Sequence, residues 1–360
     1  MKDGTADLRI RTTEPLVAPA TLAAEVPLST EAAERVRAAR GEVAAVLDGA
    51  DDRLLVVVGP CSIHDPEAAL DYATRLREVA ALHARELLVV MRVYFEKPRT
   101  VGGWKGLIND PARDGSHDIN RGLRLARTLL RDVIALGLPV GTEFLDTIFG
   151  QYYAELVAWG AIGARTVESQ VHRQLASGLS MPVGFKNRTD GDIQVAVDAI
   201  RSARLPHWFP SLTREGLPAV MGTTGNEHGH LVLRGGTSGP NYTREHVRAA
   251  KSLLRSAGLV PRVMIDCSHA TSGKDPARQP TVGADVAAQI ATGEEGIAAV
   301  MIESHLLGGA QDYRATPLVY GRSITDACLG WEQTVPVFAL LAEAVKSRRA
   351  ALGAAGRGAD

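Results

Sequence analysis

The sequence has few cysteines and no long apolar stretch. Cys61, Cys267 and Cys328 are the only cysteines in 360 residues, and an odd, sparse set of this kind is typical of a reducing cytosol rather than of a disulfide framework. No apolar run reaches the roughly 18 residues that span a bilayer, and the N-terminal MKDGTADLRIR is too polar to be a secretory signal. We therefore expect a cytoplasmic protein with no membrane partner.

Excess charge of one sign is also missing. The chain carries 40 Lys and Arg against 41 Asp and Glu, which gives a formal net charge of -1. Proteins that bind nucleic acid normally carry a clear basic excess, so we expect no nucleic-acid partner. Any anionic ligand must instead be bound by a local cluster of cations.

Short apolar runs alternate with longer amphipathic stretches along most of the chain. The helical stretches, such as PEAALDYATRLREVAALHA, place apolar residues at i, i+3 and i+4. The runs that we assign to strands are Leu54–Val58, Leu87–Val93, Pro139–Phe144, Gly160–Ala164, Pro182–Phe185, Leu231–Leu233, Val263–Ile265 and Ala298–Ile302. About eight such alternations predict an α/β fold with a parallel sheet, most simply a single (β/α)₈ barrel, with a doubly wound open sheet as the alternative.

Three segments fall outside this alternation. Residues 1–51 form an N-terminal extension, with one helix that starts at the cap-like Ser29 and runs to about Leu47. Residues 52–349 make up the barrel, and an inserted β-hairpin is expected at about 209–224, before the sixth strand. Residues 350–360 are small and polar and are expected to form a disordered tail.

Nearly every predicted strand is followed at once by a charged or reactive side chain. In an α/β barrel these positions meet at one end, where the chemistry takes place. The cations there suggest a phosphorylated carboxylic acid, because the arginine fork matches phosphate and carboxylate oxygens. The residues concerned are Cys61, Arg92, Lys97, Arg99, Glu143, Arg165, Lys186, Arg234, Asp266, His269 and Glu303.

Metal ligands have to come from dispersed positions, since the sequence has no CxxC or HExxH spacing. Cys61, His269 and Glu303 follow the first, seventh and eighth strands, which are neighbours in a closed barrel, and Asp326 lies in the loop beyond. Such a mixed sulfur, nitrogen and oxygen set suits one divalent ion, Mn²⁺, Fe²⁺, Co²⁺ or Zn²⁺. Cys267, two residues from His269, is an alternative sulfur ligand.

Several motifs in order resemble the type I, feedback-regulated 3-deoxy-D-arabino-heptulosonate 7-phosphate (DAHP) synthases. They are VGPCSIHD, MRVYFEKPRTVGGWKGLINDP, WGAIGARTVESQVHRQLASGL, PVGFKNRTDG, LRGG, MIDCSHATSGK, VMIESHL and GRSITDACLGWE. The resemblance extends from Asp7 to about Arg349. It implies a metal-dependent condensation of phosphoenolpyruvate with erythrose 4-phosphate, the first step of the shikimate pathway.

The resemblance also implies roles for individual residues. The implied metal ligands are again Cys61, His269, Glu303 and Asp326. The groups implied around phosphoenolpyruvate are Arg92, Lys97, Glu143, Ala164, Arg165, Lys186 and Arg234, and those around erythrose 4-phosphate are Pro98, Arg99, Thr100 and Asp326. In the reaction, Lys97 would donate a proton to the aldehyde, Glu143 would position water, and His269 would assist proton movement.

Regulation by an aromatic amino acid is a further implication of the resemblance. The related pocket lies at a subunit interface, so a homodimer or homotetramer is expected. The matching positions are Asp7, Gln151, Ala154, Leu175, Leu179, Ser180, Phe209 and Ser211. Two alternatives keep the phosphate contacts, namely an arabinose 5-phosphate enzyme and an amino-sugar variant; a third is a catalytically silent sensor barrel.

Overall fold

The computed structural model describes residues 4–356, and its centre is a closed barrel of eight parallel strands. The strands follow in the order β1, β2, β3, β4, β5, β8, β9 and β10, and β10 pairs with β1 to close the barrel. Their bounds are β1 Leu54–Gly59, β2 Leu87–Arg92, β3 Val140–Glu143, β4 Trp159–Ile162, β5 Val183–Lys186, β8 Gly229–Leu233, β9 Val263–Asp266 and β10 Ile297–His305. The predicted barrel is confirmed, and the open-sheet alternative is excluded.

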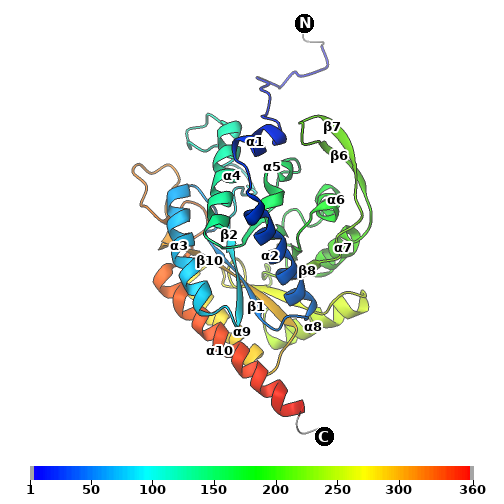
Figure 1. The fold of residues 1–360 in the computed structure, drawn as a ribbon, viewed down its shortest axis with the longest axis vertical. Helices are drawn as coiled ribbons and strands as arrows, with labels where there is room; N and C mark the ends of the chain where they lie inside the picture. The colour runs from blue at the N-terminus through cyan, green and yellow to red at the C-terminus, as the bar shows by residue number, and fades with distance from the viewer. Residues whose placement is uncertain (1–3, 357–360) are drawn as a thin grey trace.

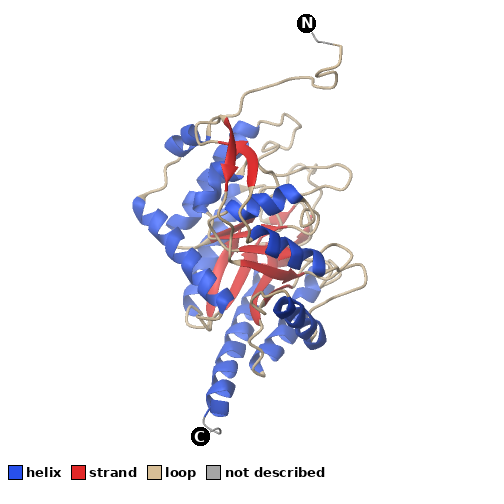
Figure 2. Cartoon of the chain, turned by 90° about the vertical axis from the view of Figure 1, so that its right-hand side faces the viewer, coloured by secondary structure: helices blue, strands red, loops and turns tan. Residues whose placement is uncertain are grey.

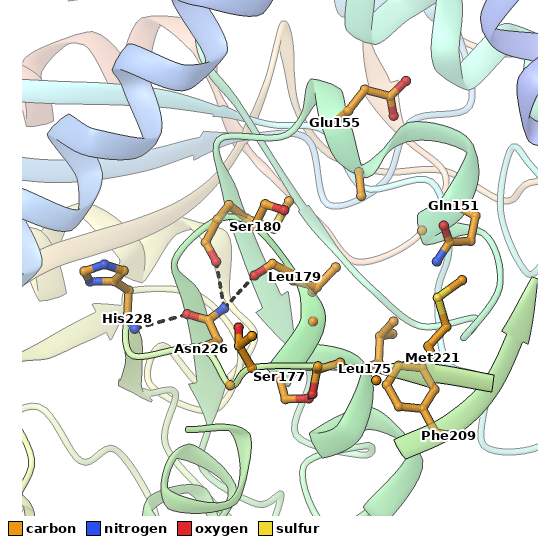
Figure 3. A pocket seen from close by; sticks show the side chains of 18 of the residues that line it. Gln151, Glu155, Leu175, Ser177, Leu179, Ser180, Phe209, Met221, Asn226 and His228 are labelled. Carbon is orange, nitrogen blue, oxygen red and sulfur yellow. Dashed lines mark hydrogen bonds between the residues drawn. The ribbon is translucent and has the colours of Figure 1, made fainter. Parts of the chain in front are cut away.

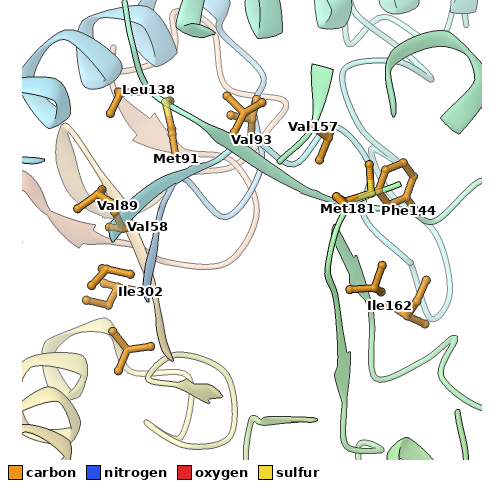
Figure 4. Close-up of a cluster of buried hydrophobic side chains, with 14 of the residues drawn as sticks. Val58, Val89, Met91, Val93, Leu138, Phe144, Val157, Ile162, Met181 and Ile302 are labelled. Carbon is orange, nitrogen blue, oxygen red and sulfur yellow. The ribbon is translucent and has the colours of Figure 1, made fainter. Parts of the chain in front are cut away.

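The two faces of β1 belong to two separate hydrophobic clusters. In β1, Val56 and Val58 pack outward against the helices, whereas Leu55 and Val57 pack inside the barrel. This alternation follows from the two-residue period of a strand. Figure 4 shows part of the outer cluster, in which Val58 lies near side chains of the adjoining strands. Because both faces are buried, the strands read as continuous apolar runs in the sequence.

Helices surround the barrel and connect successive strands (Figures 1 and 2). The principal ones are α3 Pro66–Leu82, α4 Ile119–Ala135, α6 Gln170–Gly178, α7 Gln194–Ala203, α8 Arg244–Ser256, α9 Gln279–Ala291 and α10 Trp331–Gly356. Shorter turns are α5 Gly150–Tyr153, η1 Ala154–Leu156 and η2 Pro276–Arg278. In the described part of the chain, none of the helices combines the length and the apolarity that crossing a bilayer requires.

The N-terminal extension closes one end of the barrel. It contains α1 Pro19–Glu25, which was not expected, and α2 Thr30–Asp48, whose first turn is capped by Ser29 as predicted. Near its C-terminal end, α2 contributes Val43, Val46 and Leu47 to the cluster inside the barrel. The opposite end, where the strands finish, therefore remains available for a site.

The remaining strands are additions to the barrel. The antiparallel hairpin of β6 Trp208–Leu212 and β7 Pro218–Gly222 lies between α7 and β8, where an insertion was expected. After β10 come β11 Leu307–Ala310, β12 Arg322–Ser323 and β13 Leu329–Gly330. Helix α10 continues to Gly356, so residues 350–356 are helical where a disordered tail was expected, and 357–360 lie outside the described residues.

Candidate active site at the barrel mouth

Strand period determines which polar groups enter the barrel mouth. Arg92, Lys186 and Glu303 lie two positions after the interior residues Val90, Gly184 and Met301, so their side chains point inward at the ends of the strands. Glu143, Arg234 and Asp266 also lie two positions after an interior residue of their strand and point inward in the same way. Glu143, Lys186 and Arg234, together with the following loops, border a cavity of about 420 Å³. Its lining residues are Lys97, Pro98, Thr100, Glu143, Gly163, Ala164, Arg165, Lys186, Thr189, Arg234, Gly236, Thr237, His269, Ala270, Lys274 and Asp326.

Cys61, Glu303 and Asp326 form a cluster of metal-ligand type. Their ligand atoms all lie within 4.8 Å of one another, and Cys61 Sγ is 3.6 Å from an Asp326 oxygen. The ammonium of Lys97 lies beside them, 3.0 Å from Cys61 Sγ and 3.8 Å from Asp326 Oδ2. Burial and the nearby Glu303 raise the pKa of the Cys61 thiol, so a cation bound there would displace a proton.

His269, the fourth expected ligand, lies next to this cluster rather than within it. Its Nε2 is 3.7 Å from Glu303 Oε1, and its Nδ1 is 2.9 Å from Asp266 Oδ2. The residue has φ of +53°, a left-handed conformation that is uncommon outside glycine and often marks a functional position. Cys267 packs in the outer hydrophobic cluster and is absent from the ligand cluster of the described residues, so it does not replace Cys61.

Glu303 is held from two sides. Its carboxylate accepts a 2.8 Å hydrogen bond from Arg92 Nη2, and the Gln279 side-chain amide bonds both the N–H and the C=O of its backbone, at 3.0 and 2.9 Å. Although burial by itself raises the pKa of Glu303, His269 and Arg92 outweigh it and lower that pKa. The carboxylate is therefore ionised and fixed in position.

Arg92 lies behind the cavity rather than in its wall. It is fully buried, donates to the Pro60 and Cys61 carbonyl oxygens, and stacks 3.4 Å from the centre of the Tyr94 ring. From the sequence, Arg92 was expected to line the mouth together with the other cations, and its stacking on Tyr94 could not be predicted. Only an anion that reaches into the barrel would touch it directly.

Four of the other expected cations, Lys97, Arg165, Lys186 and Arg234, do line the cavity. Arg165 donates to the Pro98 carbonyl oxygen at 2.8 Å and Lys186 pairs with Asp266 at 2.8 Å. Arg234 Nη1 donates to Gly235 O, while its buried Nε has no hydrogen-bond partner in the described part of the chain. An unpaired buried donor of this kind costs free energy unless a ligand or water accepts from it.

Glu143 is brought against the backbone of the next strand. A Cβ at Gly163 would lie only 2.1 Å from Glu143 Oε1, so glycine is required there for the carboxylate to reach the cavity. Ala164, the next residue, lines the same cavity. The short glycine-containing turn after β4 thus positions both groups.

The loop after Lys97 divides into inner and outer residues. Pro98 and Thr100 line the cavity. Arg99 is exposed, and its Nε donates to the Trp104 carbonyl oxygen at 2.8 Å. Of the three residues expected here, Arg99 is therefore not among those that line the cavity.

A second and larger cavity, of about 690 Å³, lies between the hairpin and the barrel helices. Of the positions expected there, Gln151, Ala154, Leu175, Leu179, Ser180 and Phe209 line it. Figure 3 shows Gln151, Met221 and Phe209 at one side and Asn226 and His228 at the other. We refer to it below as the side cavity.

Two expected residues of the side cavity lie elsewhere. Asp7 is exposed on the segment before α1, which extends away from the barrel (Figure 1), and Ser211 is buried in β6 without lining the cavity. Within one chain, neither residue contributes to the wall. The sequence missed Arg40 of α2, whose guanidinium bonds the carbonyl oxygens of Ala154 and Val157 and which does line the cavity.

Comparison with known proteins gives consistent results over nearly the whole chain. The model of the DAHP synthetase I family matches residues 25–339. The Phe-sensitive phospho-2-dehydro-3-deoxyheptonate aldolase of Escherichia coli K12 is 56% identical over 95% of this chain and 98% of its own length. The Trp-sensitive enzyme of Enterobacter agglomerans is 54% identical over 96% and 99%.

A solved structure agrees with these sequence matches. The phospho-2-dehydro-3-deoxyheptonate aldolase of Francisella tularensis SCHU S4 superposes with a TM-score of 0.93 at 54% identity, covering 94% of this chain and 99% of that one.

Proposed function

Because the chain belongs to the DAHP synthetase I family, we propose that it condenses phosphoenolpyruvate with erythrose 4-phosphate, giving DAHP and inorganic phosphate. The observation that carries the proposal is the placement of a thiol–carboxylate cluster beside a cavity lined with cations. Lys97 joins the two parts, since it lines the cavity and lies 3.0 Å from Cys61 Sγ.

The cations are assigned to phosphoenolpyruvate. Like charges that line one cavity repel unless an anion lies among them, and Arg165, Lys186 and Arg234 line the same cavity. Their donors suit phosphate and carboxylate oxygens. Ala164 would contribute its backbone amide, and Arg92 would meet the end of the ligand that reaches furthest into the barrel.

The donor set fits a divalent metal ion. Cys61, Glu303 and Asp326, with His269 beside Glu303, offer one sulfur, one nitrogen and two carboxylates, which suits Mn²⁺, Fe²⁺, Co²⁺ or Zn²⁺. When bound by these residues, such an ion supplies Lewis acidity that polarises a carbonyl group. Both ring nitrogens of His269 already face carboxylates, so we assign it to the metal rather than to proton movement.

The chain's own groups handle the protons and the leaving group. Carbon 3 of phosphoenolpyruvate bonds to the aldehyde carbon, and Lys97 donates a proton to the aldehyde oxygen. Water positioned by Glu143 adds to carbon 2 and gives one proton to that carboxylate. The bond between carbon 2 and the phosphate oxygen then breaks as the new hydroxyl group becomes the ketone, and the second proton leaves with the phosphate. Arg165, Lys186 and Arg234 stabilise the departing phosphate.

Erythrose 4-phosphate is assigned to the outer part of the cavity. Pro98 and Thr100 line it there, and Arg99, although exposed, is adjacent to both and carries the only charge of the three. Asp326 lies at the boundary with the metal cluster, where it would face the aldehyde end. The phosphate would then lie near the exposed loop.

The side cavity is assigned to an aromatic amino acid inhibitor. Leu175, Leu179 and Phe209 offer apolar surface, while Arg40 and Glu155 can pair with a carboxylate and an ammonium. The two bacterial relatives named above are called Phe-sensitive and Trp-sensitive, which supports inhibition without fixing the amino acid.

A homodimer or homotetramer is proposed from the hairpin surface. Trp208, Leu217 and Val220 are 75%, 63% and 71% exposed, and apolar side chains grouped in this way usually mark an interface. A partner chain would bring its own segment around Asp7 toward the side cavity. The three free, buried cysteines agree with a cytoplasmic location.

The test is phosphate release by the purified protein. We expect release only when phosphoenolpyruvate and erythrose 4-phosphate are both present, loss of release with EDTA, and recovery with Mn²⁺. Arabinose 5-phosphate and the imino analogue of erythrose 4-phosphate are run in parallel. Faster release with either of them, or none with erythrose 4-phosphate, refutes the proposed substrate. Phenylalanine, tyrosine and tryptophan are then added singly.

A further inference from the structure

Asp266 connects the two halves of the barrel mouth. The side chain is fully buried at the end of β9. One of its oxygens, Oδ2, accepts from Lys186 Nζ at 2.8 Å and lies 2.9 Å from His269 Nδ1. The other, Oδ1, accepts from the Ser268 backbone N–H at 3.0 Å and from its hydroxyl at 2.5 Å. A single carboxylate oxygen is thus shared by Lys186 and His269, and the Nδ1 of His269 also lies 2.7 Å from the Ser268 hydroxyl oxygen.

We propose that Asp266 is a positioning residue that couples metal binding to anion binding. A ligating histidine whose second nitrogen donates to a carboxylate is held in one tautomer and is a stronger donor. Lys186 competes for that carboxylate oxygen. When an anion in the cavity binds the Lys186 ammonium, Asp266 is left to interact more fully with His269, and the metal is bound more tightly.

Coupling of this kind must work in both directions. If the anion strengthens metal binding, the metal strengthens anion binding by the same factor. A metal-loaded site would then favour phosphoenolpyruvate before the aldehyde arrives. This coupling rests on the proposed function in two respects only, namely that phosphoenolpyruvate is the anion and that His269 is a metal ligand.

Gln279 provides a contrasting residue. It supports a metal ligand as well, through its two hydrogen bonds to the Glu303 backbone, but the described residues show no bond between it and Lys186. Losing Gln279 should therefore weaken the metal site without touching the coupling. Losing Asp266 should weaken the metal site and also remove the coupling.

The experiment is a Mn²⁺ titration followed by electron paramagnetic resonance, with and without phosphoenolpyruvate, so that no turnover occurs. We expect phosphoenolpyruvate to tighten Mn²⁺ binding by wild-type protein at least about 5-fold, in the range usual for coupled sites. Asp266→Asn should weaken Mn²⁺ binding about 10- to 100-fold and respond to phosphoenolpyruvate by less than about 2-fold. Gln279→Met should bind Mn²⁺ more weakly but keep the full wild-type response.

Two results would overturn the proposal: unchanged Mn²⁺ affinity in Asp266→Asn, or a phosphoenolpyruvate response equal to that of the wild type. Thermal unfolding checks that the variant folds. If it does not, Lys186→Gln decides, since Mn²⁺ should bind it without anion at least as tightly as the wild type, and weaker binding contradicts the competition. Repeating the titration with inorganic phosphate separates this proposal from the choice of substrate, because the coupling should persist even if phosphoenolpyruvate proves to be the wrong ligand.

Discussion

The cavity at the barrel mouth and the side cavity differ in how they are built. The mouth cavity, about 420 Å³, is lined from the ends of barrel strands and the loops that follow them, and its Lys97, Glu143, Lys186 and Arg234 are buried. The side cavity is larger, about 690 Å³, but it is lined by the hairpin, by short helices and by the loop before β8. The larger cavity is therefore not the one in which reactive groups converge. In the function proposed here, the reaction takes place at the strand ends, and the side cavity binds the regulator.

Glu96 lies between the two regions. It precedes Lys97, and its Oε2 accepts from the backbone N–H of Asp146, at the start of the segment that leads to α5 and the side cavity. Its other oxygen has no hydrogen-bond partner in the described residues, and burial raises its pKa to about 7. The carboxyl next to Lys97 is therefore partly protonated near neutral pH.

The largest effect is expected from removing the ammonium that joins the cavity to the metal cluster. Lys97→Met should lower kcat at least about 100-fold, because the aldehyde oxygen loses its proton donor. Steady-state phosphate release measures this. Lys346→Met, on the exposed surface of α10, is the matched control and should be nearly unchanged. Near-normal turnover in Lys97→Met would mean that the mouth cavity does not work as described.

The next effect concerns Glu96 and depends on pH. Because the folded pKa of about 7 lies above the ordinary value of 4.5, this residue's contribution to stability is fully present below about pH 4.5 and is lost as pH rises through 7. The loss amounts to roughly 3 kcal/mol. Glu96→Gln should therefore become more stable relative to wild type between pH 4.5 and pH 8.

Urea unfolding in EDTA at both pH values measures this difference. Glu343→Gln, at an exposed glutamate of α10, should show no such pH dependence. If Glu96→Gln and wild type keep a constant difference in unfolding free energy, folding does not raise the pKa of Glu96.

The contrast between the cavities also explains what could be predicted from the sequence. The strand ends were predictable because a buried parallel strand reads as an apolar run, and the residue that ends the run has to face the mouth. This gave Lys186, Glu303 and the other groups at the mouth. Arg99 was grouped with them because sequence adjacency cannot show that one side chain of a loop turns outward.

Residues that matter through their contacts with other side chains or with the backbone were harder to predict from the sequence. Asp266 stood in the predicted row, but its pairing with Lys186 and His269 depends on distances across three strands. Gln279 gave no signal, since a polar residue at the start of a helix is ordinary. Arg40 was hidden for a similar reason, because the amphipathic pattern of α2 does not show which helix or loop its polar side meets.

A moderate effect is expected in the side cavity. Gln151→Trp places a large side chain where Gln151, Met221 and Phe209 meet (Figure 3), so the inhibiting amino acid should bind at least about 10-fold more weakly, a loss of about 1.4 kcal/mol. Inhibition curves for each aromatic amino acid measure the shift. Gln194→Trp, on the exposed start of α7, should be inhibited like wild type. Unchanged inhibition in Gln151→Trp would remove the regulator from this cavity.

The smallest effect is expected far from both cavities. Ser29 Oγ accepts from the backbone N–H of Ala32 and caps α2, so Ser29→Ala should lower the unfolding free energy by about 1 kcal/mol and Tm by about 2 °C. Ser29→Asp keeps an acceptor and should restore most of the loss. Thermal unfolding gives both values. Because α2 closes the far end of the barrel and also carries Arg40, a change in kcat or in amino acid inhibition in Ser29→Ala would show that the two cavities depend on this helix and are less separate than their linings suggest.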